Sequence, residues 1–153
     1  MKKALLIFAF AILSVFAVDF SAAAQTRALE PQVQRDPLLE QDQLKNLEVV
    51  RHYFTTKKAY KAVLMRCDEI IAAYPEFSRM DEVLYLAGMS SFYLSENKGK
   101  QKLNPTIKSE AERFAPAKLR EDAVANLNLL VEKYPNSEFK GKAEKTLKLI
   151  DKK

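Results

Sequence analysis

The feature that most constrains this chain is an apolar pattern that occurs twice. Residues 63–75 and 123–135 each carry apolar side chains at spacings of one, three and four, and each pattern ends in Tyr-Pro. The matched positions are Val63, Leu64, Cys67, Ile70, Ile71, Tyr74 and Pro75, and then Ala123, Val124, Leu127, Leu130, Val131, Tyr134 and Pro135. This spacing puts the apolar groups on one face of a helix, and proline cannot continue a helix. We therefore predict two equivalent amphipathic helices, each followed by a turn.

The remaining helices follow from the same periodicity. A helix is predicted from Asp42 to about Thr56, a second over residues 79–94 with Ser78 as its N-cap, and a last one from Glu138. Between them, residues 95–120 are rich in lysine and contain glycine and proline, so they predict a long loop with at most a short helix inside. The chain is therefore expected to be all-α.

The repeat resembles a tetratricopeptide array, and in particular the BamD-type outer-membrane assembly proteins. The resemblance rests on the two Tyr-Pro endings, on the stretch Leu84–Gly88, and on the Pro-Asn-Ser-Glu-Phe run at residues 135–139. It implies antiparallel helix pairs over about residues 42–151, which form a short right-handed solenoid with a C-terminal capping helix.

The spacing of the two repeats indicates an insertion. Pro75 and Pro135 are 60 positions apart (135 minus 75), whereas a tetratricopeptide period is about 34 residues. The surplus of about 26 residues falls largely in the lysine-rich segment. We therefore expect the insertion, at about residues 95–120, to lie between the two helices of the second repeat.

The N-terminus has the layout of a signal peptide. A lysine pair at residues 2–3 precedes an apolar run over residues 4–18, and three alanines end at Ala24. We expect cleavage after Ala24, export to the periplasm or cell exterior, and a flexible tether over residues 25–41. A retained membrane anchor is the alternative, but the apolar run is short for a spanning helix.

The predicted export and the family resemblance together limit the classes of partner that we expect. The formal net charge of +5 would favour nucleic acid in a cytosolic protein, but in an exported one it favours anionic envelope components. The resemblance implies a non-catalytic scaffold of the bacterial cell envelope that binds proteins, plausibly the outer-membrane assembly machinery. Proteins of that family carry a lipidated cysteine at the cleavage site. Because the signal segment has no cysteine, we do not expect a lipid anchor here.

The sequence contains no set of residues of the kind that catalysis, cofactor binding or metal binding requires. His52 is the sole histidine and is expected on the solvent side of its helix. Cys67, the sole cysteine, matches the apolar Leu127 of the second repeat and is expected in the core. Three glycines cannot form a phosphate-binding loop. The carboxylate pairs point apart on a helix and are interpreted as helix-stabilising charges: Asp68-Glu69, Asp81-Glu82 and Glu121-Asp122.

Two sets of residues are candidates for binding a partner. The first is aromatic or pliable and lies beside the core stripe of the first helix in each pair, where tetratricopeptide arrays form their concave surface: Tyr53, Tyr85, Met89 and Phe92. The alternative is that these four are simply core residues. The second set is Lys98, Lys100, Lys102 and Lys108 of the insertion, which would contact anionic lipid or envelope polymer; the alternative is a solvated loop.

Overall fold

The computed structural model describes residues 35–101 and 106–152, and every regular element within these ranges is helical. The proposed signal peptide and residues 25–34 of the proposed tether lie outside the described residues. The elements are α2 (Pro37–His52), the π-helical turn η1 (Tyr53–Lys57), α3 (Tyr60–Ala73), α4 (Met80–Ser95), α5 (Lys108–Arg113), α6 (Pro116–Lys133) and α7 (Lys140–Ile150).

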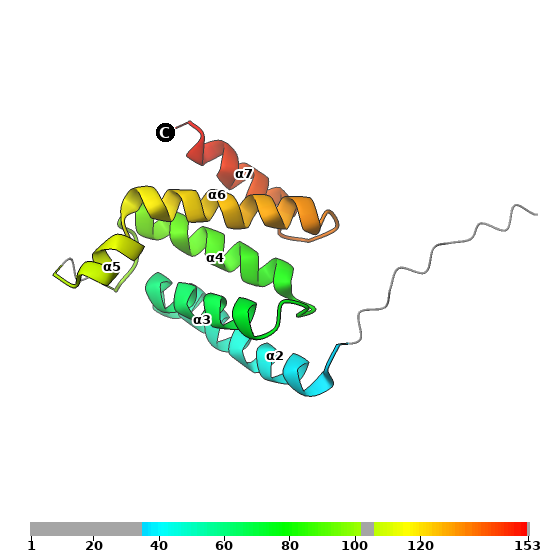
Figure 1. Ribbon diagram of the computed structural model, residues 1–153. Helices are drawn as coiled ribbons and strands as arrows, with labels where there is room; N and C mark the ends of the chain where they lie inside the picture. The colour runs from blue at the N-terminus through cyan, green and yellow to red at the C-terminus, as the bar shows by residue number, and fades with distance from the viewer. Residues whose placement is uncertain (1–34, 102–105, 153) are drawn as a thin grey trace, which may run out of the picture. The chain divides into compact units, whose positions relative to one another are not determined.

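The long helices stack in chain order (Figure 1). α2 packs on α3, α3 on α4, α4 on α6, and α6 on α7, and each runs antiparallel to the one before. The pairs α2/α3 and α4/α6 are tetratricopeptide-like, and α7 follows as a final helix. The predicted all-α, tetratricopeptide-like fold is therefore confirmed. Within the described residues, no helix combines the length and apolar character needed to cross a membrane.

The two repeats match in burial and in backbone bonding. Val63, Cys67 and Ile70 of α3 are fully buried, and so are the residues 60 positions later in α6. The turns after them also match. Phe77 N–H donates to the Tyr74 carbonyl at 3.1 Å, and Ser137 N–H donates to the Tyr134 carbonyl at 3.0 Å. Because the same turn recurs at the same offset, each Tyr-Pro pair ends its helix as predicted.

α2 begins five residues earlier than Asp42, the predicted start. Asp36 is its N-cap: the carboxylate oxygen Oδ1 accepts from the N–H of Leu38 at 2.8 Å and of Leu39 at 3.4 Å. Pro37 occupies the first helical turn, where a missing N–H costs nothing. The predicted start is too late because proline, which interrupts a helix elsewhere in this chain, here stands in its first turn.

The insertion is shorter than predicted, and it contains one short helix, as the prediction allowed. α6 begins at Pro116, again with proline in the first turn, so residues 116–120 belong to the helix and not to a loop. The insertion lies between α4 and α6, which are the two helices of the second repeat, and contains the short helix α5. Ser78 makes no side-chain cap for α4; Arg79 precedes that helix instead.

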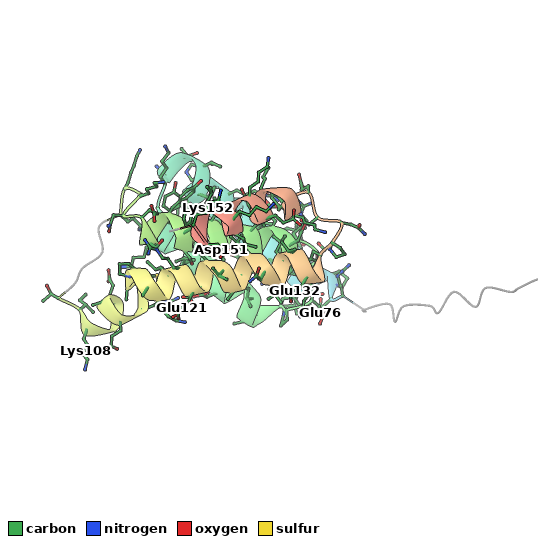
Figure 2. The ribbon with its side chains drawn as sticks, turned by 90° about the horizontal axis from the view of Figure 1, so that it is seen from above. Glu76, Lys108, Glu121, Glu132, Asp151 and Lys152 are labelled. Atoms are coloured by element: carbon green, nitrogen blue, oxygen red, sulfur yellow. The ribbon has the colours of Figure 1, made fainter. Side chains whose placement is uncertain are left out.

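Both ends of the insertion are attached to α3 or to the turn that precedes it, the second end through an ion pair between Arg113 and Asp68. At its start, Lys100 N–H donates to the Lys58 carbonyl at 3.0 Å, and Gln101 Oε1 accepts from Ala62 N–H at 3.0 Å. At its end, Phe114 is buried. Figure 2 shows Lys108 at the far tip, pointing away from the stacked helices.

Candidate functional site

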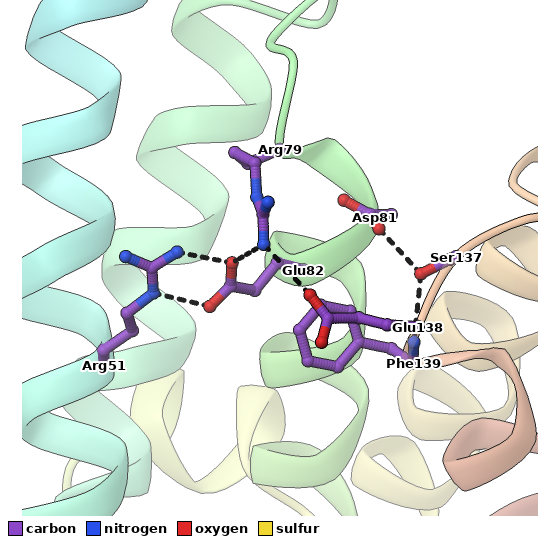
Figure 3. A network of polar contacts seen from close by, with 7 residues as sticks. All are labelled: Arg51, Arg79, Asp81, Glu82, Ser137, Glu138 and Phe139. Carbon is purple, nitrogen blue, oxygen red and sulfur yellow. Dashed lines mark hydrogen bonds and ion pairs between the residues drawn. The ribbon is translucent and has the colours of Figure 1, made fainter.

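The first helix of each pair contributes to one continuous surface, which we call the inner face. It carries Arg51 from α2, Glu82 from α4 and Glu138 from the turn before α7, which Figure 3 shows together, and also Tyr85 of α4, whose ring stacks on Phe139. Leu44 and Arg51 are seven residues apart, which is close to two helical turns, so both lie on the side of α2 that faces α4. The side chain of Leu44 is 41% exposed.

A fork of arginine hydrogen bonds joins α2 to α4 across this face (Figure 3). Arg51 Nε donates to Glu82 Oε1 at 2.5 Å and Arg51 Nη2 donates to Glu82 Oε2 at 2.6 Å. Arg79 Nη2 donates to the same Oε2 at 2.9 Å and also reaches Glu138 Oε1 at 3.4 Å. The Glu82 side chain is 8% exposed, whereas those of Arg51 and Arg79 are 42% and 40% exposed. The carboxylate is therefore buried beneath two accessible guanidinium groups.

The two arginines keep this buried carboxylate ionised. Burial by itself raises the pKa of Glu82, but hydrogen bonds from Arg51 and Arg79, together with their charges, outweigh it and lower the pKa below its ordinary value. The same hydrogen bonds raise the pKa of both arginines. Two-pronged pairing fixes side-chain direction as well as charge, so α2 and α4 are held in one relative position.

The turn between α6 and α7 is attached to α4 by polar and aromatic contacts. Ser137 Oγ donates to Asp81 Oδ2 at 2.6 Å and accepts from Phe139 N–H at 3.1 Å. The Phe139 ring stacks on Tyr85, with centroids 4.9 Å apart and planes 24° apart. Asp81 and Glu82 therefore do more than stabilise the start of their own helix, because each bonds to another element.

The four aromatic or pliable candidates occupy different environments. Met89 and Phe92 are each 7% exposed, and Thr146 Oγ1 of α7 donates to the Met89 sulfur at 3.3 Å, so both belong largely to the packing. Tyr85 is half-buried on the inner face. Tyr53 is also half-buried, but it is the first residue of η1 and lies roughly 200° around the helix axis from Arg51, so it faces another side.

The lysines of the insertion do not form one patch. Lys98 lies over the rings of Phe92 and Tyr93, 5.9 and 5.7 Å from their centroids, and so covers an aromatic cluster. Lys100 is exposed at the start of the insertion. Lys108 is at its tip and 3.9 Å from Glu112, and Lys102 lies outside the described residues. The described positions give no concentrated positive surface.

The two residues considered for catalysis or metal binding are His52 and Cys67, and neither environment favours such a role. His52 is exposed. Cys67 is fully buried, and burial raises the pKa of its thiol, so the sulfur is held as the neutral, unreactive thiol. In the described part of the chain, no three residues of the His, Cys, Asp or Glu type gather as metal ligands.

The sequence analysis did not identify Arg51 and Arg79 as part of the candidate site. Arg79 and Glu82 are three apart on a helix, a spacing that signals an ion pair, and this signal was available. Arg51 is 31 residues from Glu82, so only the folded arrangement reveals their contact.

Comparison with known proteins assigns the sequence to a family. Neither a search of curated proteins nor a search of solved structures gave a match. The sequence does match the family YfiO, described as outer membrane lipoprotein, over residues 7–153. That description supports a cell-envelope location and gives no support to our expectation that a lipid anchor is absent. Because the match covers nearly the whole sequence, the chain belongs to the YfiO family of outer membrane lipoproteins.

Proposed function

We propose that this protein is a non-catalytic scaffold of the bacterial cell envelope that binds other proteins through its inner face and acts in outer-membrane protein assembly, as BamD-type proteins do. Family membership supports the location and the class of protein. The signal-peptide layout supports export, with cleavage after Ala24.

The observation that carries this proposal is a rigid surface with accessible binding groups. The bonds from Arg51 and Arg79 to Glu82 hold the surface in place, while Leu44 is 41% exposed and the Glu138 side chain is 68% exposed. A surface ordered before binding loses little entropy when a partner docks. Apolar, aromatic and arginine groups are those that contribute most at protein interfaces.

The same features indicate the chemistry of the partner. Leu44 and the Tyr85 ring offer apolar contact, and the exposed parts of two guanidinium groups offer donors for carboxylate or carbonyl oxygens. A polypeptide segment with an apolar side chain next to an acidic group would satisfy both. Because it involves one charged contact beside apolar ones, binding of this kind should depend less steeply on salt than binding of anionic polymer or lipid through several lysines.

The test is outer-membrane protein assembly in cells depleted of this protein. Depletion should slow the appearance of folded outer-membrane β-barrels, measured by their heat-modifiable mobility in gels. The wild-type chain should restore assembly, whereas Leu44→Asp should not, because it places a charge where an apolar contact is needed.

The matched control is Met65→Asp on α3. Met65 is 45% exposed, close to the value for Leu44, and helical spacing puts it on the side of α3 opposite the buried Val63, Cys67 and Ile70. Both variants should keep the helix content of the wild type. Normal assembly after depletion, or equal failure of both variants, would argue against the proposed role of the inner face.

A further inference from the structure

The first helix of the stack carries many of the exposed apolar side chains. Of the eight large apolar side chains that are exposed in the described part of the chain, four belong to α2: Leu38, Leu39, Leu44 and Val49. α2 lies at the opposite end of the stack from α7 (Figure 1), so among the described elements it has neighbours on one side only. Its other side is a candidate surface for association with another chain.

Four residues of α2 share one face of the helix, which we call the free face: Leu38, Asp42, Lys45 and Val49. Their spacings of four, three and four keep them within about 60° of one another around the helix axis. Leu47 is fully buried and lies nine residues after Leu38, which is about 180° around the axis. The free face therefore points away from the helices on which α2 packs.

All four side chains of the free face are accessible. Leu38 is 74% exposed and Val49 is 40% exposed, and the side chains of Asp42 and Lys45 are each 67% exposed. Lys45 Nζ lies 3.4 Å from Asp42 Oδ1, so this ion pair stays within the one helix. An apolar side chain at each end and a charged pair in the middle are thus open to another surface.

The pattern of the free face is complementary to itself. The pair Leu38 and Val49 and the pair Asp42 and Lys45 are both centred between residues 43 and 44. When two such helices pack antiparallel about a twofold axis through this midpoint, each Asp42 lies opposite Lys45 of the partner subunit. Each Leu38 then lies opposite Val49 of the partner subunit. A twofold interface requires this kind of self-complementary surface.

We propose that two copies of this chain associate through their free faces, as an antiparallel pair of α2 helices related by a twofold axis. The four charges at the centre alternate in sign, so each keeps the opposite charge in its own chain and gains one in the other. The apolar side chains cover both ends of this charged centre. A parallel pair would place like charges opposite each other, which is unfavourable.

This contact should be weak and should leave the inner face open. α2 has 16 residues and is about 24 Å long, so one helix pair buries less surface than a standard stable interface. We therefore expect a dissociation constant of about 10–100 µM. Arg51 of the inner face lies 13 residues after Leu38, about 140° around the helix axis. The dimer thus presents two inner faces, and its formation does not depend on their proposed function.

The first experiment is sedimentation velocity of the exported chain, residues 25–153. The wild type should pass from monomer to dimer over about 1–300 µM. Asp42→Lys and Lys45→Asp should each weaken dimerisation about tenfold or more, because the symmetry creates two contacts between like charges. The double variant that carries both substitutions should dimerise as the wild type does, since the two charges have changed places.

Glu69→Lys on α3 is the matched control. Glu69 Oε2 lies 2.7 Å from Arg66 Nη1 three residues earlier, and the Glu69 side chain is 57% exposed. The substitution therefore reverses one charge of the same kind of exposed ion pair, on another helix. It should leave dimerisation unchanged; a loss equal to that of Asp42→Lys would overturn the proposal.

Disulfide crosslinking tests the antiparallel arrangement. A mixture of Leu38→Cys and Val49→Cys chains should form a linked dimer on mild oxidation, and neither variant alone should do so. In the antiparallel pair, the two copies of one position are about 16 Å apart along the helix axis, too far for a disulfide. Cys67, the sole natural cysteine, is buried and should not compete.

Three results would overturn the proposal. The first is a wild-type chain that stays monomeric at every concentration, as it would if its own residues 25–34 occupied the free face. The second is a series of oligomers that grow beyond the dimer, which would indicate that α2 meets α7 of the next copy. The third is crosslinking of the Leu38→Cys chain by itself, which would indicate a parallel pair.

Discussion

Gly88 of α4 lies directly against Leu127 of α6. A Cβ atom at Gly88 would be 2.7 Å from Leu127 Cγ and 2.8 Å from Cδ2, and 3.3 Å from the carbonyl oxygen of Ala123. Leu127 is fully buried, so it has no open space to move into. The two helices of the second repeat therefore meet at a point where only glycine fits.

Gly88→Ala should lower the free energy of unfolding by about 1–2 kcal/mol. Alanine favours a helix by about 1 kcal/mol, but forcing an extra methyl into a packed seam costs roughly 1–3 kcal/mol, and the buried contact decides the sign. Urea unfolding followed by circular dichroism measures the difference.

Gly141→Ala is the matched control, because nothing lies within 4 Å of a Cβ atom there. Gly141 is an exposed residue of α7, so the substitution should raise stability by about 0.5–1 kcal/mol. If the two substitutions change stability in the same direction, the close approach of α4 and α6 is not as described.

Glu82→Gln should destabilise the fold by about 1–2 kcal/mol at pH 7. This loss is smaller than the loss expected for a fully buried ion pair, because both arginines are partly exposed and solvent screens their charge. The pKa of Glu82 is lowered in the folded state, so its stabilising contribution is present above the ordinary glutamate pKa of about 4.3. It is lost as the pH falls through the lowered folded value, because the unfolded chain takes up the proton first.

The difference in stability between wild type and Glu82→Gln should therefore shrink from pH 7 toward pH 3. Chemical unfolding at several pH values measures it. Glu121→Gln, an exposed position on α6, should change stability by less than about 0.5 kcal/mol at any of them. A difference for Glu82→Gln that stays constant with pH would contradict the role given to the arginine fork.

Tyr74→Phe should lower stability by about 0.5–1.5 kcal/mol, since the Tyr74 hydroxyl accepts from the N–H of Asp36 at 3.0 Å. This bond ties the start of α2 to the end of α3. Tyr134→Phe at the equivalent position of the second repeat is the control, because its hydroxyl makes no such bond to any residue that the structure describes. Thermal unfolding should separate the two; an equal loss would mean that the ring, not the hydroxyl, matters at both positions.

Phe114→Ala should detach the insertion while leaving the stacked helices folded. Phe114 is buried, and Lys61 and Arg113 lie over its ring at 5.7 and 5.4 Å from the centroid. Hydrogen exchange of the α5 amides should accelerate by about tenfold or more, whereas that of α4 should change little. Exchange that accelerates equally in α4 would show that the insertion is part of one cooperative unit.

The sequence predicts the helices of this fold because their ends carry local signals. Tyr74-Pro75 and Tyr134-Pro135 stop α3 and α6 in the same way, and apolar spacing gives the buried faces. The same local reasoning fails at Pro37 and Pro116, where proline begins a helix. Whether proline starts or interrupts a helix depends on the residues that follow it, and here those residues continue the helix.

The candidate site was only partly predictable. In α4, 13 of 16 residues are buried, so periodicity cannot tell which of its aromatic and pliable side chains reach the surface. Tyr85 remains partly accessible. Met89 is covered by α7, where Thr146 contacts its sulfur, and Lys98 lies over the ring of Phe92. The contact of Arg51 with Glu82 joins distant parts of the chain, and no local sequence pattern predicts it.

The most direct test of the inner face is photocrosslinking in intact cells. A photoreactive amino acid placed at Glu138 lies on this face, and one placed at Met65 lies on the exposed side of α3, opposite the buried residues of that helix. Glu138 should crosslink to proteins of the outer-membrane assembly machinery, and Met65 should not. Crosslinks to that machinery from Met65 alone, or from neither position, would contradict a scaffold that works through its inner face.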